Sequence, residues 1–196
     1  RYFPNEKITN GMGNFEAQLN LQMSKNGNEK TRAWGKRLAA QYTSPRDIAN
    51  AIMREFQQGG FRYTLSPNAM PTDPIDRFLF EARAGFCAHY AGAMVYALRA
   101  ANVPARMVTG YQGGSTLSDR VLQIRQYDAH AWVEVLIDND WVRYDPTSAV
   151  APSRLTLGLE EALEELGESR QSSVLEKFGN AKFFTTLQNW FQQLDY

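Results

Sequence analysis

The chain has 196 residues, a length that suits one large domain or one domain with appendages. Hydrophobic residues make up 43% of it and aromatic residues 12%, which is enough apolar surface for a packed core and excludes a globally disordered chain. Lysine plus arginine equals aspartate plus glutamate at 21 each, and this balance argues against nucleic acid as a partner, because a nucleic-acid-binding domain normally carries a basic excess.

The first thirty residues are rich in glycine and asparagine and show little periodicity. We therefore expect 1–30 to be an irregular lead-in with at most a short strand at 15–23. The next segment predicts a helix at about 31–42, because Trp34 and Leu38 recur at helical spacing.

A second helix is predicted after Ser44. The sequence SPRD that begins there is a typical helix start, since serine caps the first turn, proline fits it and an acid follows within it. Two glycines at 59–60 end this helix, and its predicted buried stripe consists of Ile48, Ile52, Met53 and Phe56. Residues 61–67 alternate like a strand, a proline-rich loop follows, and a short helix is expected from Asp76.

The clearest helix begins just after Gly85 and contains the single cysteine, Cys87. Its apolar stripe consists of Ala91, Val95 and Leu98, at spacings of four and three residues. Small residues cluster in and just before its first turns: Ala84, Gly85, Ala88, Ala91, Gly92 and Ala93. Such residues let a helix lie close against other backbone, so we expect the N-terminal end of this helix to be buried.

Strand-like segments separated by turn residues follow at 105–111, 121–137 and 141–147. A polar loop is expected at 112–120, and Asp138-Asn139 is expected to form a two-residue turn. These segments predict an antiparallel meander. Helices followed by such a sheet indicate an α+β fold instead of an alternating parallel one.

The domain organisation follows from these elements. Residues 31–154 are assigned to one domain, and the Glu-rich and amphipathic residues 155–196 to a C-terminal helical extension. No apolar run approaches the roughly 18–20 uncharged residues that a membrane-spanning helix needs, and no signal segment opens the chain. Because the first residue is Arg1 and not methionine, we expect the chain to be a piece of a longer protein.

Cys87 stands where the clearest helix begins, and this position favours the thiolate that makes cysteine a nucleophile. The free N–H groups and the positive end of the helix dipole stabilise negative charge there. A single cysteine also excludes an internal disulfide and a zinc site of several thiolates. Taken alone, however, a lone cysteine is more often a small buried hydrophobic residue.

Two histidines are available as a base for Cys87. His89 is two residues away, and on a helix such neighbours point to different sides, so it is poorly placed. His130 lies in a predicted strand, and the expected two-residue turn makes it the diagonal neighbour of Asp145 on one face of the sheet. Diagonal partners lie about 7–8 Å apart at the backbone, within reach of an imidazole and a carboxylate. Asp145 is the expected partner that orients His130, and Asp128 is held in reserve.

A cysteine, a histidine and an aspartate within reach of one another are the groups needed for acyl transfer through a thioester. The developing oxyanion requires hydrogen-bond donors, and the backbone N–H of Cys87 can be one of them. Tyr63, in the strand-like stretch before the thiol, is the candidate for the second donor. Spacing alone leaves a structural role open for His130 and Asp145, because strand histidines often make structural hydrogen bonds and Asp-Pro often starts a turn.

Two stretches resemble the core of the transglutaminase-like superfamily: GFCAHYAGAMVYALRAANVPARMVTGY and DAHAWVEVLIDNDWVRYDPT. The matching residues fall in five motifs: Gly85-Phe86-Cys87, Pro104-Ala105-Arg106, Gly110-Tyr111, His130-Ala131-Trp132 and Asp145-Pro146-Thr147. The resemblance covers roughly 74–154 and, more loosely, extends from Ile48. The segments YQGG and AVAPSR are similar to the bacterial TgpA-type branch of this superfamily.

The resemblance implies a papain-like α+β fold, with the nucleophile at a helix N-terminus packed on an antiparallel sheet that carries histidine and aspartate. It implies that Cys87 is the nucleophile, His130 the general base and acid, and Asp145 the residue that orients the histidine. In the TgpA-type branch such a domain is the periplasmic part of a bacterial inner-membrane protein. The rest of the parent chain is accordingly expected to be membrane-embedded.

Three functions remain open at this point. The first is transglutaminase-like acyl transfer from a glutamine or other amide of a protein or peptide, with an amine or water as acceptor. The second is a cysteine peptidase or amidase that acts on cell-envelope peptides, and the third is a non-catalytic binding domain. No cofactor is expected, and no metal, because the chain has no loop of alternating oxygen ligands that ends in a bidentate acid.

Overall fold

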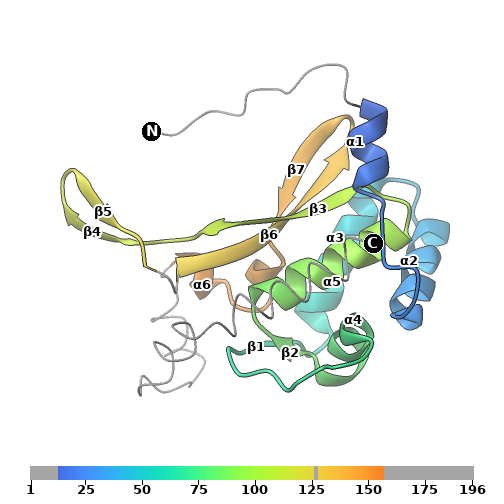
Figure 1. Ribbon diagram of the computed structural model, residues 1–196, viewed down its shortest axis with the longest axis horizontal. Helices are drawn as coiled ribbons and strands as arrows, with labels where there is room; N and C mark the ends of the chain where they lie inside the picture. Colours follow the sequence, from blue (N-terminus) through green and yellow to red (C-terminus); the bar gives the residue numbers. More distant parts are fainter. Residues whose placement is uncertain (1–12, 126–127, 157–196) are drawn as a thin grey trace.

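Helices cover one side of a small antiparallel sheet in the computed structural model, which describes residues 13–125 and 128–156 (Figure 1). The expected α+β class is confirmed by this arrangement of helices and antiparallel strands. The predicted C-terminal extension lies outside the described residues from position 157 onward. Within the described part of the chain, no helix has both the length and the apolar character needed to span a bilayer.

The lead-in contains a helix, α1 (Gly13–Leu19), where the sequence predicted at most a short strand at 15–23, so that prediction is wrong. Tertiary contacts hold this helix in place. Glu16 forms an ion pair with Arg106 at 2.8 Å, and Arg106 also pairs with Glu134 of the sheet at 2.7 Å. A helix of seven residues is not stable by itself, so such contacts decide its conformation.

Two helices follow as predicted, α2 (Glu29–Gln41) and α3 (Pro45–Gln58). Ser44 caps α3, because its hydroxyl oxygen accepts a hydrogen bond from the Arg46 N–H at 3.2 Å. The predicted stripe of α3 is buried except for Met53, which is partly buried. These apolar side chains join α3 to the main hydrophobic core.

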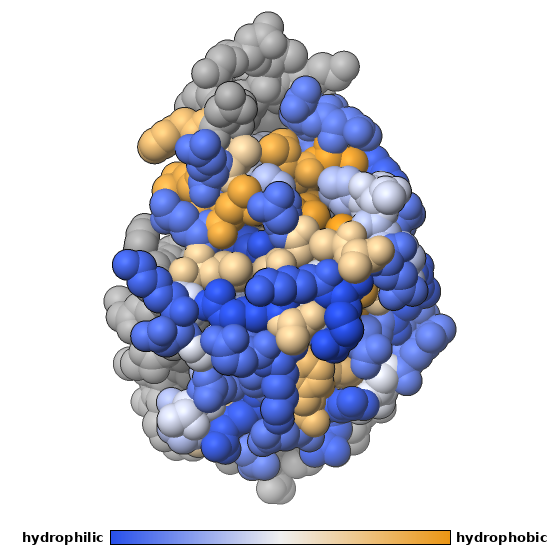
Figure 2. Space-filling model, turned by 90° about the vertical axis from the view of Figure 1, so that its right-hand side faces the viewer, coloured by the Kyte–Doolittle hydropathy of each residue, from blue (hydrophilic) through white to orange (hydrophobic). Residues whose placement is uncertain are grey.

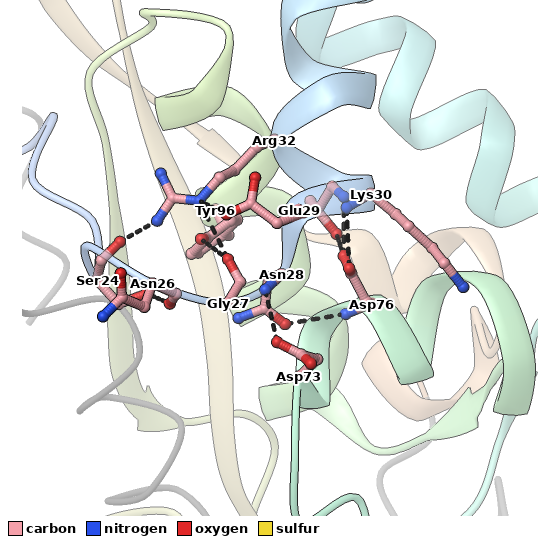
Figure 3. A network of polar contacts seen from close by, with 11 residues as sticks. Ser24, Asn26, Gly27, Asn28, Glu29, Lys30, Arg32, Asp73, Asp76 and Tyr96 are labelled. Carbon is pink, nitrogen blue, oxygen red and sulfur yellow. Dashed lines mark hydrogen bonds and ion pairs between the residues drawn. The ribbon is translucent and has the colours of Figure 1, made fainter.

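A polar network ties the start of α2 to the start of α4 (Pro74–Arg77) (Figure 3). The Asp76 carboxylate accepts hydrogen bonds from the N–H groups of Lys30 and Thr31 at 2.9 and 2.8 Å, and from the Thr31 hydroxyl at 2.6 Å. Asn28 Oδ1 in turn accepts from the N–H groups of Ile75 and Asp76 at 3.0 and 3.1 Å. Each helix start is therefore satisfied by a side chain from the other segment. The π-helical turn η1 (Phe78–Ala82) follows.

The thiol helix α5 (Cys87–Ala100) runs through the centre of the fold and is buried along almost its whole length (Figure 1). A short parallel pair precedes it, β1 (Arg62–Tyr63) and β2 (Ala84–Gly85), so the strand predicted at 61–67 is shorter than expected. Small residues allow close helix packing, because a Cβ added at Gly35 of α2 would lie only 2.6 Å from the Ala100 Cβ.

The main sheet has the order β3-β6-β7, formed by β3 (Ala105–Tyr111), β6 (Ala129–Ile137) and β7 (Asp140–Tyr144), and is antiparallel throughout. The predicted turn is confirmed. Asp138 and Asn139 both have positive φ, at 53° and 66°, and Ile137 pairs with Asp140. The chain then enters the 3₁₀ turn η3 (Pro146–Ala149) and the short helix α6 (Ser153–Thr156).

A hairpin of β4 (Ser115–Ser118) and β5 (Val121–Gln123) projects from the end of the main sheet (Figure 1). The sequence predicted a loop at 112–120 and one strand over 121–137, and both predictions are wrong. Gly113 and Gly114 have φ values of 97° and 129°, which let the chain leave β3 and turn into the hairpin.

Exposed hydrophobic side chains occur on the hairpin and on α1. On the hairpin they include Leu117 and Leu122, and on α1 they are Phe15 and Leu19. The face of the molecule shown in Figure 2 is mainly hydrophilic, with hydrophobic residues gathered in its upper part. The apolar face of the main sheet is not among these surfaces, because its side chains are buried against α5.

Candidate active site

Cys87 is the first residue of α5, and Phe86 is the N-cap. The thiol is buried, with 2% of the residue exposed. The predicted helix start is therefore confirmed, and Cys87 lies at the positive end of a helix of fourteen residues.

His89 has a structural place in this helix. Its Nδ1 accepts a hydrogen bond from the Phe86 N–H at 3.4 Å, and its ring packs edge-to-face on Phe86 at 4.3 Å. Burial lowers the pKa of His89 to about 3, so the ring is neutral and suited to accept that bond. A Cβ at Gly85 would lie 2.8 Å from the His89 side chain, so only glycine fits there. As its spacing predicted, His89 is not arranged as a base for Cys87.

His130 and Asp145 are in direct contact. His130 Nε2 donates a hydrogen bond to Asp145 Oδ2 at 2.8 Å, and the predicted contact is confirmed. Asp145 Oδ1 accepts from the Thr147 N–H at 3.2 Å, which holds the carboxylate at the start of η3. Asp128, the reserve partner, instead accepts a hydrogen bond from the Arg125 N–H at 2.7 Å. Asp145 is thus the carboxylate that contacts the imidazole.

The second ring nitrogen of His130, Nδ1, is buried and has no hydrogen bond of regular geometry to the described residues. The Cys87 side chain adjoins this ring. Burial, the largest effect, lowers the pKa of His130, but its interactions with Asp145 and Cys87 outweigh burial and raise that pKa to about 9. The imidazole is therefore protonated at neutral pH, and Nδ1 is the nitrogen left to exchange a proton with the thiol.

Two further side chains hold the His130–Asp145 pair: Trp132, which the sequence placed in a family motif without a role, and Arg143, which was not singled out from the sequence. Arg143 Nη2 donates to Asp145 Oδ2 at 3.1 Å, and its guanidinium lies 4.4 Å from the centre of the Trp132 ring. Trp132 in turn stacks on His130, with 6.2 Å between ring centres and 24° between planes. Burial raises the pKa of Asp145, but hydrogen bonds from His130 and Arg143 outweigh it and leave that pKa below its usual value. Successive side chains of a strand point to opposite faces, so Arg143 and Asp145, two residues apart, are expected on the same face. This alternation is the sequence signal that could have indicated Arg143.

Tyr63 reaches the site from β1. It pairs with Gly85 in the parallel β1–β2 ladder and is buried, so the backbone fixes it close to the start of α5. Burial and the Cys87 charge raise the pKa of Tyr63, whereas contacts with Arg154 and with the Cys87 backbone lower it. The net effect is a strong increase, and the hydroxyl stays protonated as a donor. Arg154, the last residue of the AVAPSR segment, to which the sequence assigned no role, is also part of this cluster.

A cavity lies next to Tyr63, but Cys87, His130 and Asp145 do not line it. Its volume is about 360 Å³, and it is lined by Arg62, Tyr63, Thr64, Ser66, Pro67, Asn68, Ala82 and Ala84. Within 13–125 and 128–156, no group of three His, Cys, Asp or Glu residues could hold a metal ion. The arrangement is therefore that of a thiol, an imidazole and a carboxylate at a helix start, with a hydroxyl and a backbone N–H beside the thiol.

Comparisons with known proteins agree with this arrangement. A family model for the transglutaminase-like superfamily matches residues 32–146. A protein-glutamine gamma-glutamyltransferase of Pseudomonas aeruginosa is 47% identical over 146 residues, which are 74% of this chain and 22% of that protein. The chain therefore spans about a fifth of the length of the curated relatives that it matches.

Solved structures are similar as well. The crystal structure of the periplasmic domain of TgpA from Pseudomonas aeruginosa is 44% identical with a TM-score of 0.72, over 75% of this chain and 52% of that chain. A chain from Cytophaga hutchinsonii, provisionally described as a cysteine protease, is 22% identical with a TM-score of 0.50, over 68% of this chain and 43% of that chain. The similarity to the Cytophaga hutchinsonii chain shows a shared fold and nothing about function.

Proposed function

The chain belongs to the transglutaminase-like superfamily, and on this premise we propose that it transfers acyl groups from glutamine side chains of proteins or peptides through a thioester on Cys87. The observation that carries the proposal is the placement of Cys87 at the start of a buried helix, beside the hydrogen-bonded pair of His130 and Asp145. The curated relative named as a protein-glutamine gamma-glutamyltransferase supports glutamine as the acyl donor.

The first half-reaction forms the thioester. The Cys87 thiolate attacks the carboxamide carbon of a glutamine side chain, and a tetrahedral oxyanion forms. Protonated His130 then gives its proton to the departing nitrogen, the carbon–nitrogen bond breaks and ammonia leaves. Asp145 keeps the imidazole in the orientation in which Nδ1 faces the sulfur.

The second half-reaction releases the product. An amine attacks the thioester carbon, neutral His130 takes the proton of the amine, and the carbon–sulfur bond breaks to restore thiolate and imidazolium. The product is a new amide bond. Water in place of the amine gives glutamate by the same steps, so the acceptor that reaches the thioester decides between transfer and hydrolysis.

The oxyanion needs at least two donors. The backbone N–H of Cys87 is one, because it lies in the first turn of α5, where N–H groups have no acceptor within the helix. The Tyr63 hydroxyl is the other, because Tyr63 is held by the β1–β2 ladder beside the Cys87 backbone and keeps its proton. We expect Tyr63→Phe to lower kcat roughly 100–1000-fold, the usual effect of removing one oxyanion donor.

We propose that the reaction takes place in the bacterial cell envelope. The likeness to a periplasmic domain supports a periplasmic location for this domain. We propose that the rest of the parent chain is embedded in the inner membrane. The acyl donor would then be an envelope protein or peptide.

The test is incubation of the domain with a glutamine-bearing protein and a labelled primary amine. We expect the label to enter the protein at glutamine, ammonia to be released, and both signals to vanish in Cys87→Ala and to drop strongly in His130→Ala. Ammonia without incorporation would turn the proposal into a glutamine amidase. Cleavage of a backbone bond without ammonia would overturn it in favour of a peptidase.

A further inference from the structure

Arg154 is a buried cation next to the site, with 1% of the residue exposed. It comes from α6, nine residues after Asp145 along the chain. Its Nη2 donates to the Ala129 carbonyl at 3.3 Å, and its Nη1 donates to the Gln112 carbonyl at 3.3 Å. Ala129 directly precedes His130, so the guanidinium is anchored at the end of β6 that carries the histidine.

The same guanidinium interacts with the Tyr63 side chain through its charge and as a hydrogen-bond donor, and both interactions lower the pKa of Tyr63 against the larger effect of burial. Tyr63 is fixed from its other side by β2, where it pairs with Gly85, and the Thr64 N–H donates to the Gly85 carbonyl at 2.9 Å. Gly85 is two residues before Cys87. Arg154 thereby links the end of β6 that carries His130 to the tyrosine near the start of α5.

We propose that Arg154 is a positioning residue of the oxyanion site, which holds the Tyr63 hydroxyl toward the Cys87 N–H and strengthens it as a donor. This role depends on the proposed acyl transfer. A guanidinium donates only, so a hydroxyl that accepts its hydrogen bond has its own proton free for another acceptor. The positive charge also makes that proton a better donor to the oxyanion, in a buried site where charge effects are strong.

The experiment is a double-mutant cycle of Arg154→Met and Tyr63→Phe, with kcat and KM measured for each variant. We expect Arg154→Met to lower kcat about 10–100-fold with little change in KM. In the double variant we expect kcat to be close to that of Tyr63→Phe alone, because Arg154 acts through the hydroxyl. Independent losses that multiply would overturn the inference.

Arg99→Met is the matched control. Arg99 is also buried, and it donates to the carbonyls of Ala105 and Gln22 at 2.8 and 2.7 Å, in the last turn of α5. Both substitutions remove a buried arginine held by two carbonyls, so both should lower stability. Only Arg154→Met should lower kcat, and an equal loss in Arg99→Met would assign the effect to stability. If Arg154→Met does not fold, Arg154→Lys takes its place with the same expected direction.

A second readout separates positioning from damage to the nucleophile. Alkylation of Cys87 by iodoacetamide passes through no oxyanion, so its rate in Arg154→Met should match the wild type. A parallel fall of alkylation and acyl transfer would overturn the inference.

An activated ester separates this inference from the proposed function, because p-nitrophenyl acetate also acylates a thiol through an oxyanion. A wild-type burst with this ester that Arg154→Met slows would support the role of Arg154 even if glutamine is not a substrate. A wild type with no burst, or a burst that Arg154→Met leaves unchanged, would contradict it.

Discussion

The hydrogen bond from His130 Nε2 to Asp145 decides which ring nitrogen is left for the thiol. It also raises the pKa of His130 to about 9, together with the interaction with Cys87 and against the effect of burial. Because the pKa of His130 in the folded state lies above the usual 6.5, protonated His130 stabilises the fold. This contribution to the free energy of unfolding is complete below pH 6.5 and is lost as pH rises through about 9. The same protonation state provides the acid that the first half-reaction requires.

We therefore predict that kcat/KM falls as pH rises through about 9, where His130 loses its proton. Asp145→Asn should lower activity roughly 100–10,000-fold, because it removes the carboxylate that orients the ring. It should also move the alkaline limb to lower pH, because that carboxylate raises the pKa of His130. The pH profile of both proteins is the measurement, and an unshifted alkaline limb in Asp145→Asn would contradict the role of Asp145.

Arg143 is predicted to affect the acid side of the profile. It donates to Asp145 and helps to hold the pKa of that carboxyl below its usual value, against burial. Arg143→Met should therefore raise the pKa of Asp145. The stabilisation that the ionised Asp145 contributes would then be lost at a higher pH than in the wild type when the solution is acidified. The Arg143 side chain is half-exposed, and we expect a cost at neutral pH of no more than about 1 kcal/mol. Acid unfolding of the variant and the wild type tests this, and identical acid midpoints would contradict it.

The residues of the site differ in how far the sequence could predict them. Cys87 and His130–Asp145 could be predicted, because a helix start and a two-residue turn fix their places by local rules. Arg143 and Arg154 could not, although strand alternation placed Arg143 on the right face. Arg154 follows the turn η3, and the position of a side chain beyond such a turn cannot be predicted from helical or strand periodicity.

At the scale of elements, the paired capping of α2 and α4 connects the N-terminal helices to the segment that leads to Cys87 (Figure 3). Asp76→Ala would leave two backbone N–H groups and one hydroxyl without their acceptor. We predict a loss of about 2–4 kcal/mol in the free energy of unfolding, since hydrogen bonds to charged groups contribute about 1.5–3 kcal/mol each but are not additive.

Asp73→Ala is the control for that prediction. Asp73 accepts one hydrogen bond in the same network, from the Asn28 N–H at 2.8 Å. Because Asp73 is exposed and water competes for this hydrogen bond, its removal should cost only about 1 kcal/mol. Denaturant unfolding of the two variants compares them, and an equal loss in both would show that Asp76 has no special place in the network.

The errors at this scale share a physical reason. The helix α1 and the hairpin β4–β5 are short elements whose large apolar side chains are partly exposed, so no buried face gives them a readable period. The helices α2 and α3 and the strands β3, β6 and β7 were predictable because their apolar residues face one core. In such segments the local sequence pattern does not determine the secondary structure, and long-range contacts such as the Glu16–Arg106 ion pair determine it instead.

At the scale of the whole molecule, the fold brings the start of α5, the end of the sheet and the turn after β7 to one place. All the groups required for acyl transfer then come from side chains and backbone. We predict that activity is independent of calcium, because the proposed steps use Cys87, His130, Asp145 and the oxyanion donors without a metal. Amine incorporation should be unchanged by a chelator and by added calcium, and a calcium requirement would contradict the prediction.

The most direct test of the central claim is mass spectrometry of the domain after rapid acid quenching during turnover of a glutamine peptide. We expect a covalent adduct on the peptide that contains Cys87, with the mass of the substrate less that of ammonia, and no adduct in Cys87→Ala. The adduct should disappear when a primary amine is added before quenching. Turnover of glutamine with no adduct on Cys87, or with the same rate in Cys87→Ala, would contradict a thioester mechanism on Cys87.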